Sequence, residues 1–202
     1  MMTKTVVIAR YNEDLSWTKD LNKDIQVVIY NKGTDVLDTH IKLKNTGRES
    51  DTYLRYIIDN YESLSDVTVF LQGNALWHRT KHLKEAISQI NDDSIDVLVN
   101  LIGYTVTSDG NGCPSHCKLP INETALRLGV QSEKYTFGPG AQYIVPRRMI
   151  ISKSLSWWKK ALEIHSVPDP GCPCHGNLNK MPWVFERLWP YIWNLEEIDH
   201  EN

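Results

Sequence analysis

The sequence predicts an α/β fold in which helices flank one mostly parallel central sheet. Short runs of β-branched and aromatic residues, such as residues 5–9, 25–30 and 67–71, are typical of buried strands. Between such runs lie segments whose apolar residues recur every three or four positions, as they do in amphipathic helices. The connections are short, and strands that alternate with helices over short connections build a parallel sheet with covering helices.

The size and composition of the chain suit a single domain of residues 1–202. A 202-residue chain with 41% hydrophobic residues can bury a substantial core. No apolar run reaches the roughly 20 residues of a membrane helix, and a strand-like run follows residues 1–4 directly, where a signal peptide would need its apolar region. We therefore expect a cytoplasmic protein without a transmembrane segment. The net charge of −3 argues against nucleic acid as a partner.

The first three predicted strands each end in a polar loop. The first two are followed by short polar segments, and a helix with apolar residues at helical spacing then leads into the third. A capping-box pattern, Thr46-x-x-Glu49, marks the start of this helix. The loop residues are Arg10, Tyr11, Asn12 and Glu13 after the first strand, Asn31, Lys32 and Gly33 after the second, and Gln72, Gly73 and Asn74 after the third.

The rest of the chain is predicted to contain two further strands and three longer helices. A helix over residues 82–90 and a strand over 95–102 continue the alternation, and residues 107–120 are predicted to form a loop or lid. Residues 122–128 are predicted to form one or two helical turns, and residues 141–145 a fifth strand. Helices follow over 154–165 and 182–193, and Pro190 is expected to kink the last one or end it early.

The polar strand ends are expected to form a ligand site, because ligands of open α/β sheets bind beyond the carboxyl ends of the strands. Arg10, Lys32 and Arg48 are cations that suit a diphosphate, and Arg48 lies in the first turn of a helix, where free backbone N–H groups favour anions. The alternative for each, taken singly, is a solvated surface cation.

Three further residues are candidates for acid–base chemistry. Glu49 either caps its helix or acts on a substrate, and His78 is either a base or a surface imidazole. Glu186 on the last helix either reaches the site or pairs with Arg187 or another cation. No serine elbow, Walker loop, G-x-G-x-x-G or H-E-x-x-H pattern occurs, which argues against the common hydrolase, P-loop, Rossmann and zincin classes.

The four cysteines form two close pairs, and each pair has a histidine next to one of its members. Cys113 and Cys117 are spaced C-x3-C, and Cys172 and Cys174 are spaced C-x-C, whereas zinc knuckles usually have C-x2-C. A structural zinc site, free thiols and a disulfide between the two pairs are the alternatives.

Five sequence blocks carry a resemblance to a known family. In chain order they are ARYNE at 9–13, GRE at 47–49 with YLRYIIDNY at 53–61, FLQGN at 70–74, GAQYIV at 140–145 and FERLW at 185–189. Together they resemble a family of uncharacterised domains that look like small GT-A-type glycosyltransferases. This resemblance implies a GT-A-like fold, with a nucleotide-binding half at about residues 1–104 and an acceptor-side half at about 105–202.

The resemblance also implies roles for the polar residues. The loops after the first two strands would contact a nucleotide-sugar donor, Gln142 and Trp183 would line the acceptor side, and Glu186 would be the candidate base. The segment 72–74 stands where such enzymes usually keep an Asp-x-Asp motif for Mn or Mg. Amides lack the charge of that motif, so either the transfer proceeds without a metal or the family binds something else. Without a metal, Arg10, Lys32 and Arg48 would stabilise the departing diphosphate.

We therefore expect a glycosyltransferase that moves a sugar from a nucleotide-sugar donor to a glycan or protein hydroxyl. One alternative is a non-catalytic carbohydrate- or nucleotide-binding module that kept the fold and lost the metal motif. The other is a zinc-stabilised interaction domain built around the Cys and His clusters.

Overall fold

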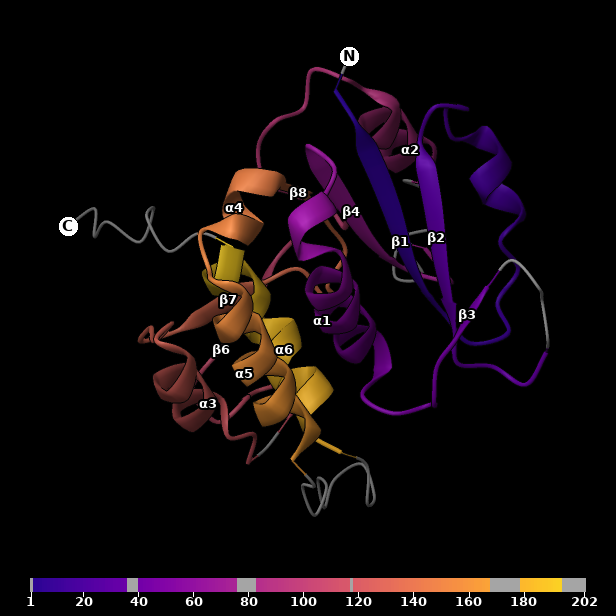
Figure 1. The fold of residues 1–202 in the computed structure, drawn as a ribbon. Coiled ribbons are helices and arrows are strands. Elements are labelled where there is room, and N and C mark those ends of the chain that lie inside the picture. Colours follow the sequence, from indigo (N-terminus) through magenta and orange to yellow (C-terminus); the bar gives the residue numbers. More distant parts are fainter. Residues whose placement is uncertain (1, 36–39, 76–82, 117, 168–178, 194–202) are drawn as a thin grey trace.

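A mixed six-stranded sheet flanked by helices forms the centre of the computed structural model (Figure 1). The structure describes residues 2–35, 40–75, 83–116, 118–167 and 179–193. The strand order is β3-β2-β1-β4-β8-β5. The strands are β1 (Lys4–Arg10), β2 (Gln26–Asn31), β3 (Ile41–Lys42), β4 (Val67–Gln72), β5 (Val99–Asn100) and β8 (Tyr143–Pro146).

The sheet is parallel on one side only. β1 pairs in parallel with β2 and β4, and β2 pairs in parallel with β3. β8 runs antiparallel to both β4 and β5. Tyr143 at the start of β8 pairs with Phe70 near the end of β4, so the chain enters β8 at the carboxyl edge of the parallel strands and has to run back.

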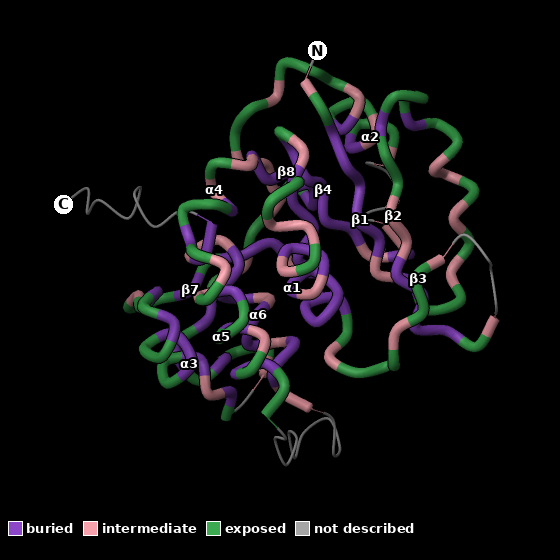
Figure 2. Tube along the Cα trace, viewed as in Figure 1, coloured by how far each residue is buried: buried purple, intermediate pink, exposed green. Residues whose placement is uncertain are grey.

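Two apolar layers cover the two faces of the sheet. Side chains alternate across a strand, so Val7 of β1 and Phe70 of β4 pack into one layer while Val6 and Val69 pack into the other. The first layer is completed by α1 (Arg48–Asn60), α3 (Ile121–Leu128), α5 (Leu155–Ser166) and α6 (Met181–Trp193), and the second by α2 (Leu83–Asn91). Figure 2 shows the buried course of β1 and β4 between these layers.

Most predicted elements are present, with shifted ends. The predicted strand at 95–102 shortens to β5, because only Val99 and Asn100 pair with β8. The predicted loop at 107–120 was wrong at its start, where β6 (Val106–Ser108) pairs with β7 (Tyr135–Phe137) in a separate two-stranded sheet. Short elements complete the described chain: η1 (Ser16–Asp20), η2 (Tyr61–Ser63) and α4 (Arg147–Ile151).

Pro190 was expected to kink its helix or end it early, and the second alternative was wrong, because α6 continues to Trp193. The missing N–H of a proline weakens a helix, but the last turn of α6 is held by burial. Trp189 and Trp193 stack with ring centroids 4.9 Å apart, and Trp193 also stacks on Phe70 of the sheet at 5.6 Å. These ring contacts tie the end of α6 to β4.

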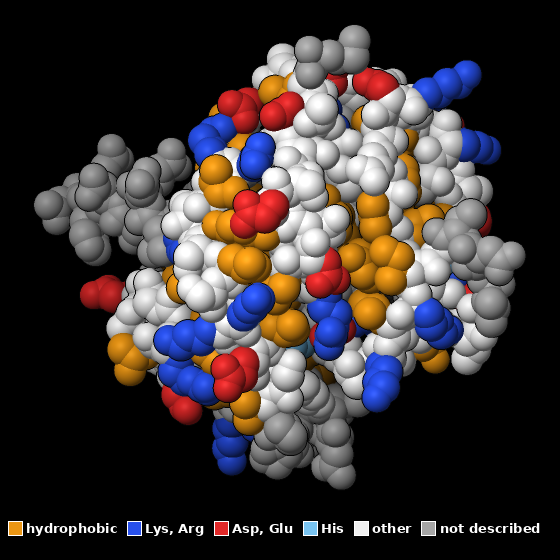
Figure 3. Space-filling view, in the orientation of Figure 1, with side chains coloured by type: hydrophobic (Ala, Val, Ile, Leu, Met, Phe, Trp, Pro, Cys, Tyr) orange, Lys and Arg blue, Asp and Glu red, His pale blue; other side chains and the backbone are white. Residues whose placement is uncertain are grey.

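The surface on the side of α1 and α5 carries mixed charge. Figure 3 shows Lys and Arg side chains interspersed with Asp and Glu side chains on this face, with apolar side chains between them. The described residues on this face therefore do not form the continuous basic surface typical of nucleic-acid-binding proteins. No helix in the described part of the chain is long and apolar enough to span a membrane.

Trp189→Ala is expected to lower the free energy of unfolding by about 3–5 kcal/mol, because the fully buried indole is replaced by a cavity. Urea denaturation followed by circular dichroism measures this change. The control is Leu126→Ala at a 63% exposed position, which should change the free energy of unfolding by less than about 0.5 kcal/mol. A loss for Trp189→Ala as small as that of the control would contradict the packing of α6.

Candidate active site

A cavity of about 250 Å³ lies where β1, β2 and β4 end and α1 begins. β1 lies between β2 and β4, so the strand order reverses there, and such a switch point is where open α/β sheets bind ligands. The predicted convergence of strand ends thus occurs at this edge. The cavity is lined by Ala9, Arg10, Tyr11, Glu13, Lys32, Asn45, Arg48, Glu49 and Gln72.

The loop after β1 is shaped by contacts with its own neighbours. Glu13 accepts a hydrogen bond from the backbone N–H of Tyr11, and Asn12 takes a left-handed conformation with φ of 63°. A Cβ atom on Gly73 would lie 2.6 Å from Oε2 of Glu13 and 3.2 Å from the Cα of Arg10, so a larger residue would force both to shift. Gly73 therefore has a packing role, while the neighbouring Gln72 lines the cavity.

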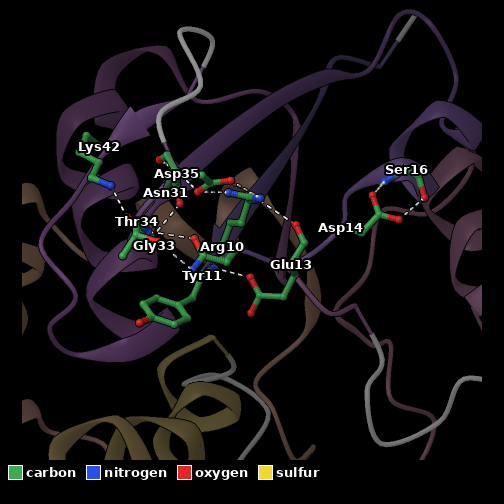
Figure 4. Close-up of polar contacts among 11 residues, drawn as sticks. Arg10, Tyr11, Glu13, Asp14, Ser16, Asn31, Gly33, Thr34, Asp35 and Lys42 are labelled. Atoms are coloured by element: carbon green, nitrogen blue, oxygen red, sulfur yellow. Dashed lines mark hydrogen bonds and ion pairs between the residues drawn. The ribbon is translucent and has the colours of Figure 1, made fainter.

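Arg10 is engaged by an internal carboxylate. Its terminal nitrogens contact the two carboxylate oxygens of Asp35 at 2.8 and 2.7 Å, and its Nε donates to the carbonyl of Glu13 at 2.8 Å (Figure 4). Asn31 donates to the same carboxylate at 3.0 Å. Hydrogen bonds from Arg10 and Asn31 hold the pKa of Asp35 well below its usual range. Arg10 and Asn31, both expected to contact a donor, thus order the rim of the cavity.

Lys32 is a buried anchor between β2 and α1. Its ammonium donates to the carbonyls of Thr46 and Arg48 at 2.6 Å each and to Oδ2 of Asp51 at 2.9 Å. An ammonium has three donors, so all of them are in use. Burial lowers the pKa of Lys32, and the neighbouring Asp51 opposes this shift. Lys32 therefore fastens the start of α1, and a phosphate would have to displace one of these partners.

Arg48 is the expected cation that keeps an exposed guanidinium beside the cavity. Its side chain is 55% exposed, and its Nε lies 3.6 Å from Oε2 of Glu49. Its guanidinium carbon lies 5.6 Å from the ring centroid of Trp183, which places α6 beside the start of α1. Arg48 itself has a left-handed φ of 47°.

Glu49 does not cap its helix, so the capping-box interpretation was wrong. Gly47, with φ of 65°, is the N-cap residue, and the helix start has no side-chain capping hydrogen bond. The left-handed Gly47 starts the helix one residue after Thr46 and turns Glu49 inward, where it is 6% exposed. Burial raises the pKa of Glu49 to about 7; Arg48 lowers it and Glu186 raises it further. A carboxyl group with this pKa can exchange a proton near neutral pH.

The acceptor-side residues lie next to this cavity. Oε1 of Glu186 accepts from the backbone N–H of Gly140 at 2.6 Å, and Oε2 contacts Arg187 at 3.2 Å. A Cβ atom on Gly140 would lie 3.5 Å from Nε2 of Gln142 and 3.8 Å from Nε2 of Gln72. Gly140 therefore lies close to both Glu186 and Gln142 and to Gln72, which lines the cavity.

Several predicted residues do not line the cavity. Gly33 donates its N–H to the side chain of Asn31, and Asn12 accepts from the N–H of Thr34, so both build the rim (Figure 4). Asn74 is not among the lining residues, and His78 lies outside the described residues. Asn45 was missed, because no pattern marks a single amide in the loop before a helix.

The zinc prediction stays untested at three of its four cysteines. Cys117, Cys172 and Cys174 lie outside the described residues, and Cys113 is exposed with a free thiol. Among the described residues, no three His, Cys, Asp or Glu side chains are grouped so that they could hold a metal ion. His116, next to Cys117 in sequence, lies 3.0 Å from Arg187 through its Nδ1.

Comparison with known proteins identifies one family. A family described as "Protein of unknown function (DUF3431)" matches residues 6–137, which is more than half of the chain. The matched region contains every residue that lines the cavity. No curated protein and no solved structure matches the chain.

Glu49→Gln is expected to raise the free energy of unfolding at pH 8 and to leave it nearly unchanged at pH 4. The pKa of Glu49 rises from an ordinary 4.5 to about 7 on folding. Between these values the unfolded chain releases a proton that the folded chain keeps, so stability falls as the pH rises. Glutamine carries no such proton, so the variant avoids this loss of stability, which is on the order of 3 kcal/mol above the folded pKa.

Urea denaturation of both proteins at acidic, neutral and alkaline pH measures this dependence. The matched control is Glu123→Gln on the exposed side of α3. The same change in stability for Glu49→Gln at every pH would contradict the raised pKa.

Lys32→Met is expected to lower the free energy of unfolding by about 3–5 kcal/mol, because it removes one of the two cations that pair with the buried Asp51 and the donor to two backbone carbonyls. Thermal and urea denaturation measure this loss. Arg148→Met is the matched control, since Arg148 and Asp96 form an ion pair in which both side chains are more than half exposed. The control should cost no more than about 1 kcal/mol. Equal losses would contradict the anchoring role of Lys32.

Proposed function

We propose that this chain, which belongs to the DUF3431 family of proteins of unknown function, is a glycosyltransferase with a GT-A-like fold. It moves a sugar from a nucleotide-sugar donor to a hydroxyl group of a glycan or protein. The observation that carries the proposal is the pairing of Arg48 and Glu49 at the start of α1, on the wall of a cavity at the sheet's switch point.

The two residues suit the two halves of a sugar transfer. The half-exposed Arg48 can stabilise the negative charge that develops on a departing diphosphate. The buried Glu49, with a pKa of about 7, can take the proton from an acceptor hydroxyl at neutral pH. Both groups come from consecutive residues, so the fold positions them together.

In the proposed step the acceptor oxygen bonds to the anomeric carbon of the donor sugar. Its proton passes to the carboxylate of Glu49. The bond between the anomeric carbon and the diphosphate oxygen breaks, and the nucleoside diphosphate leaves with the electron pair. Arg48 and the free N–H groups of the first turn of α1 stabilise that leaving group. A single displacement of this kind inverts the sugar.

Glu49 is a better candidate base than Glu186, which the resemblance favoured. Both oxygens of Glu186 already have partners, the N–H of Gly140 and the guanidinium of Arg187. To act as a base, Glu186 would have to give up one of these partners. Glu186 and Trp183 are then assigned to the acceptor side of the site.

The proposed transfer runs without Mn or Mg. Gln72 lines the cavity in the place of the expected carboxylate motif, and an amide offers no charge to hold a divalent cation against a diphosphate. The carboxylate of Glu13, which also lines the cavity, accepts a hydrogen bond from the backbone N–H of Tyr11.

A non-catalytic nucleotide- or carbohydrate-binding module is the second candidate. The engagement of Arg10 by Asp35 and of Lys32 by Asp51 favours it, because a diphosphate would have to compete with these internal carboxylates for both cations. A module of this kind would bind the donor without turning it over. Such a module would therefore still bind the donor after substitution of Glu49, and the unmodified protein would show no transferase activity.

Donor binding is tested by a thermal-shift screen of nucleoside diphosphates and nucleotide sugars, with and without Mn. A ligand at one hundred times its dissociation constant should stabilise the protein by about 2.7 kcal/mol. Arg48→Ala should abolish the shift while leaving the unliganded melting temperature nearly unchanged, because its side chain is more than half exposed. Arg127→Ala, at an exposed position of α3, is the matched control and should retain the shift.

Absence of a shift with every nucleotide and nucleotide sugar would overturn the donor-site proposal. Where a donor binds, Glu49→Gln should lower its turnover by about 10²–10⁴-fold and retain binding. Binding without turnover in the unmodified protein would instead support the second candidate. A shift that requires Mn would contradict transfer without a metal.

A further inference from the structure

Arg187 is a fully buried cation beside the candidate site. It is 1% exposed, and one terminal nitrogen donates to the carbonyl of Trp183 at 2.8 Å and to Oε2 of Glu186 at 3.2 Å. The other terminal nitrogen lies 3.0 Å from Nδ1 of His116, and the guanidinium carbon lies 4.6 Å from the ring centroid of Phe137. An arginine stays protonated in proteins and cannot accept a hydrogen bond, so Nδ1 of His116 must be the acceptor.

The burial of Arg187 requires a nearby anion. A buried guanidinium without a carboxylate would be costly, and within the described part of the chain its ion-pair partner is Glu186. Glu186 is in turn fixed at its other oxygen by the N–H of Gly140. These contacts hold both carboxylate oxygens of Glu186 in place.

Glu49 has the opposite surroundings. It is buried, and its nearest cation, Arg48, lies 3.6 Å away on a half-exposed side chain. Glu186 on α6 raises the pKa of Glu49 further. The two carboxyl groups of the site thus lie in contrasting environments. The charged and titratable groups that act on Glu49 are Arg48, Lys32, Glu186 and, through its own shift, Tyr53.

We propose that Arg187 is a positioning residue that holds the carboxylate of Glu186 beside Glu49, so that Glu49 is the carboxyl group that takes up and releases the proton. Arg187 acts through Glu186 and does not itself touch the cavity wall. The inference refines the chemistry of the site on which the proposed function rests. Its test needs neither a nucleotide-sugar donor nor turnover, so the inference and the proposed function can fail separately.

The test is a pH titration of the protein with ¹³C-labelled glutamate side chains, followed by NMR. In the unmodified protein the Glu49 signal should titrate near pH 7. Glu186→Gln removes the opposing charge and should lower the pKa of Glu49 by about one unit. The glutamine side chain retains an oxygen that can accept the hydrogen bond from the N–H of Gly140. Glu123→Gln, the same substitution at an exposed position of α3, should leave the pKa of Glu49 unchanged.

Arg187→Met tests the positioning role directly. Without the guanidinium, the carboxylate of Glu186 loses its ion-pair partner and its fixed position, so Glu49 should titrate at a lower pH. Arg187→Lys should restore the Glu49 titration in part, since it keeps the charge. A role in packing alone would lower the stability of Arg187→Met without moving the titration of Glu49. Where Arg187→Met does not fold, Glu186→Gln decides, and an unchanged Glu49 titration in that variant overturns the proposal.

Discussion

The ammonium of Lys32 fixes the geometry on which the whole site depends. It joins the end of β2 to the start of α1 through two carbonyl groups and the carboxylate of Asp51. The two carbonyls belong to Thr46 and Arg48, on either side of the left-handed Gly47. A helix start held in this way cannot rotate, so Arg48 stays at the rim and Glu49 stays inside. The lysine that was expected to bind phosphate thus determines where the other two groups lie.

The charges of the site fall into two groups. In the first group, Arg10 pairs with Asp35 and Lys32 pairs with Asp51, and these pairs hold loops in place. The second group consists of Arg48, Glu49, Glu186 and Arg187. Burial is the largest cause of the raised pKa of Glu49. Access of water to Glu49 would therefore lower its pKa more than the loss of the neighbouring charge on Glu186 would.

The edge of the sheet where the site lies could be predicted from the sequence, because the pattern of apolar and polar residues shows where each strand ends. Buried parallel strands are marked by apolar runs, and the polar residues that follow Ala9, Tyr30 and Leu71 had to meet at one edge. The partners of the cations could not be predicted, because Asp35 and Asp51 are brought to them by the fold and no fixed spacing marks such pairs. The direction of β8 was equally hidden, since an apolar run carries no information about which way it enters the sheet. Thr46-x-x-Glu49 misled because Gly47 accepts a backbone conformation that overrides the capping pattern.

The position of β8 makes the two halves of the chain interdependent. β8 comes late in the sequence but lies between β4 and β5, so it closes the hydrogen-bonding edge of β4 that the first half leaves open. The family match ends at residue 137, before β8, α5 and α6. A fragment trimmed to those limits would expose an unpaired strand edge, a template for aggregation, and would lose the aromatic rings that cover Phe70. The cooperative folding unit of this chain therefore extends beyond the segment by which its family is recognised.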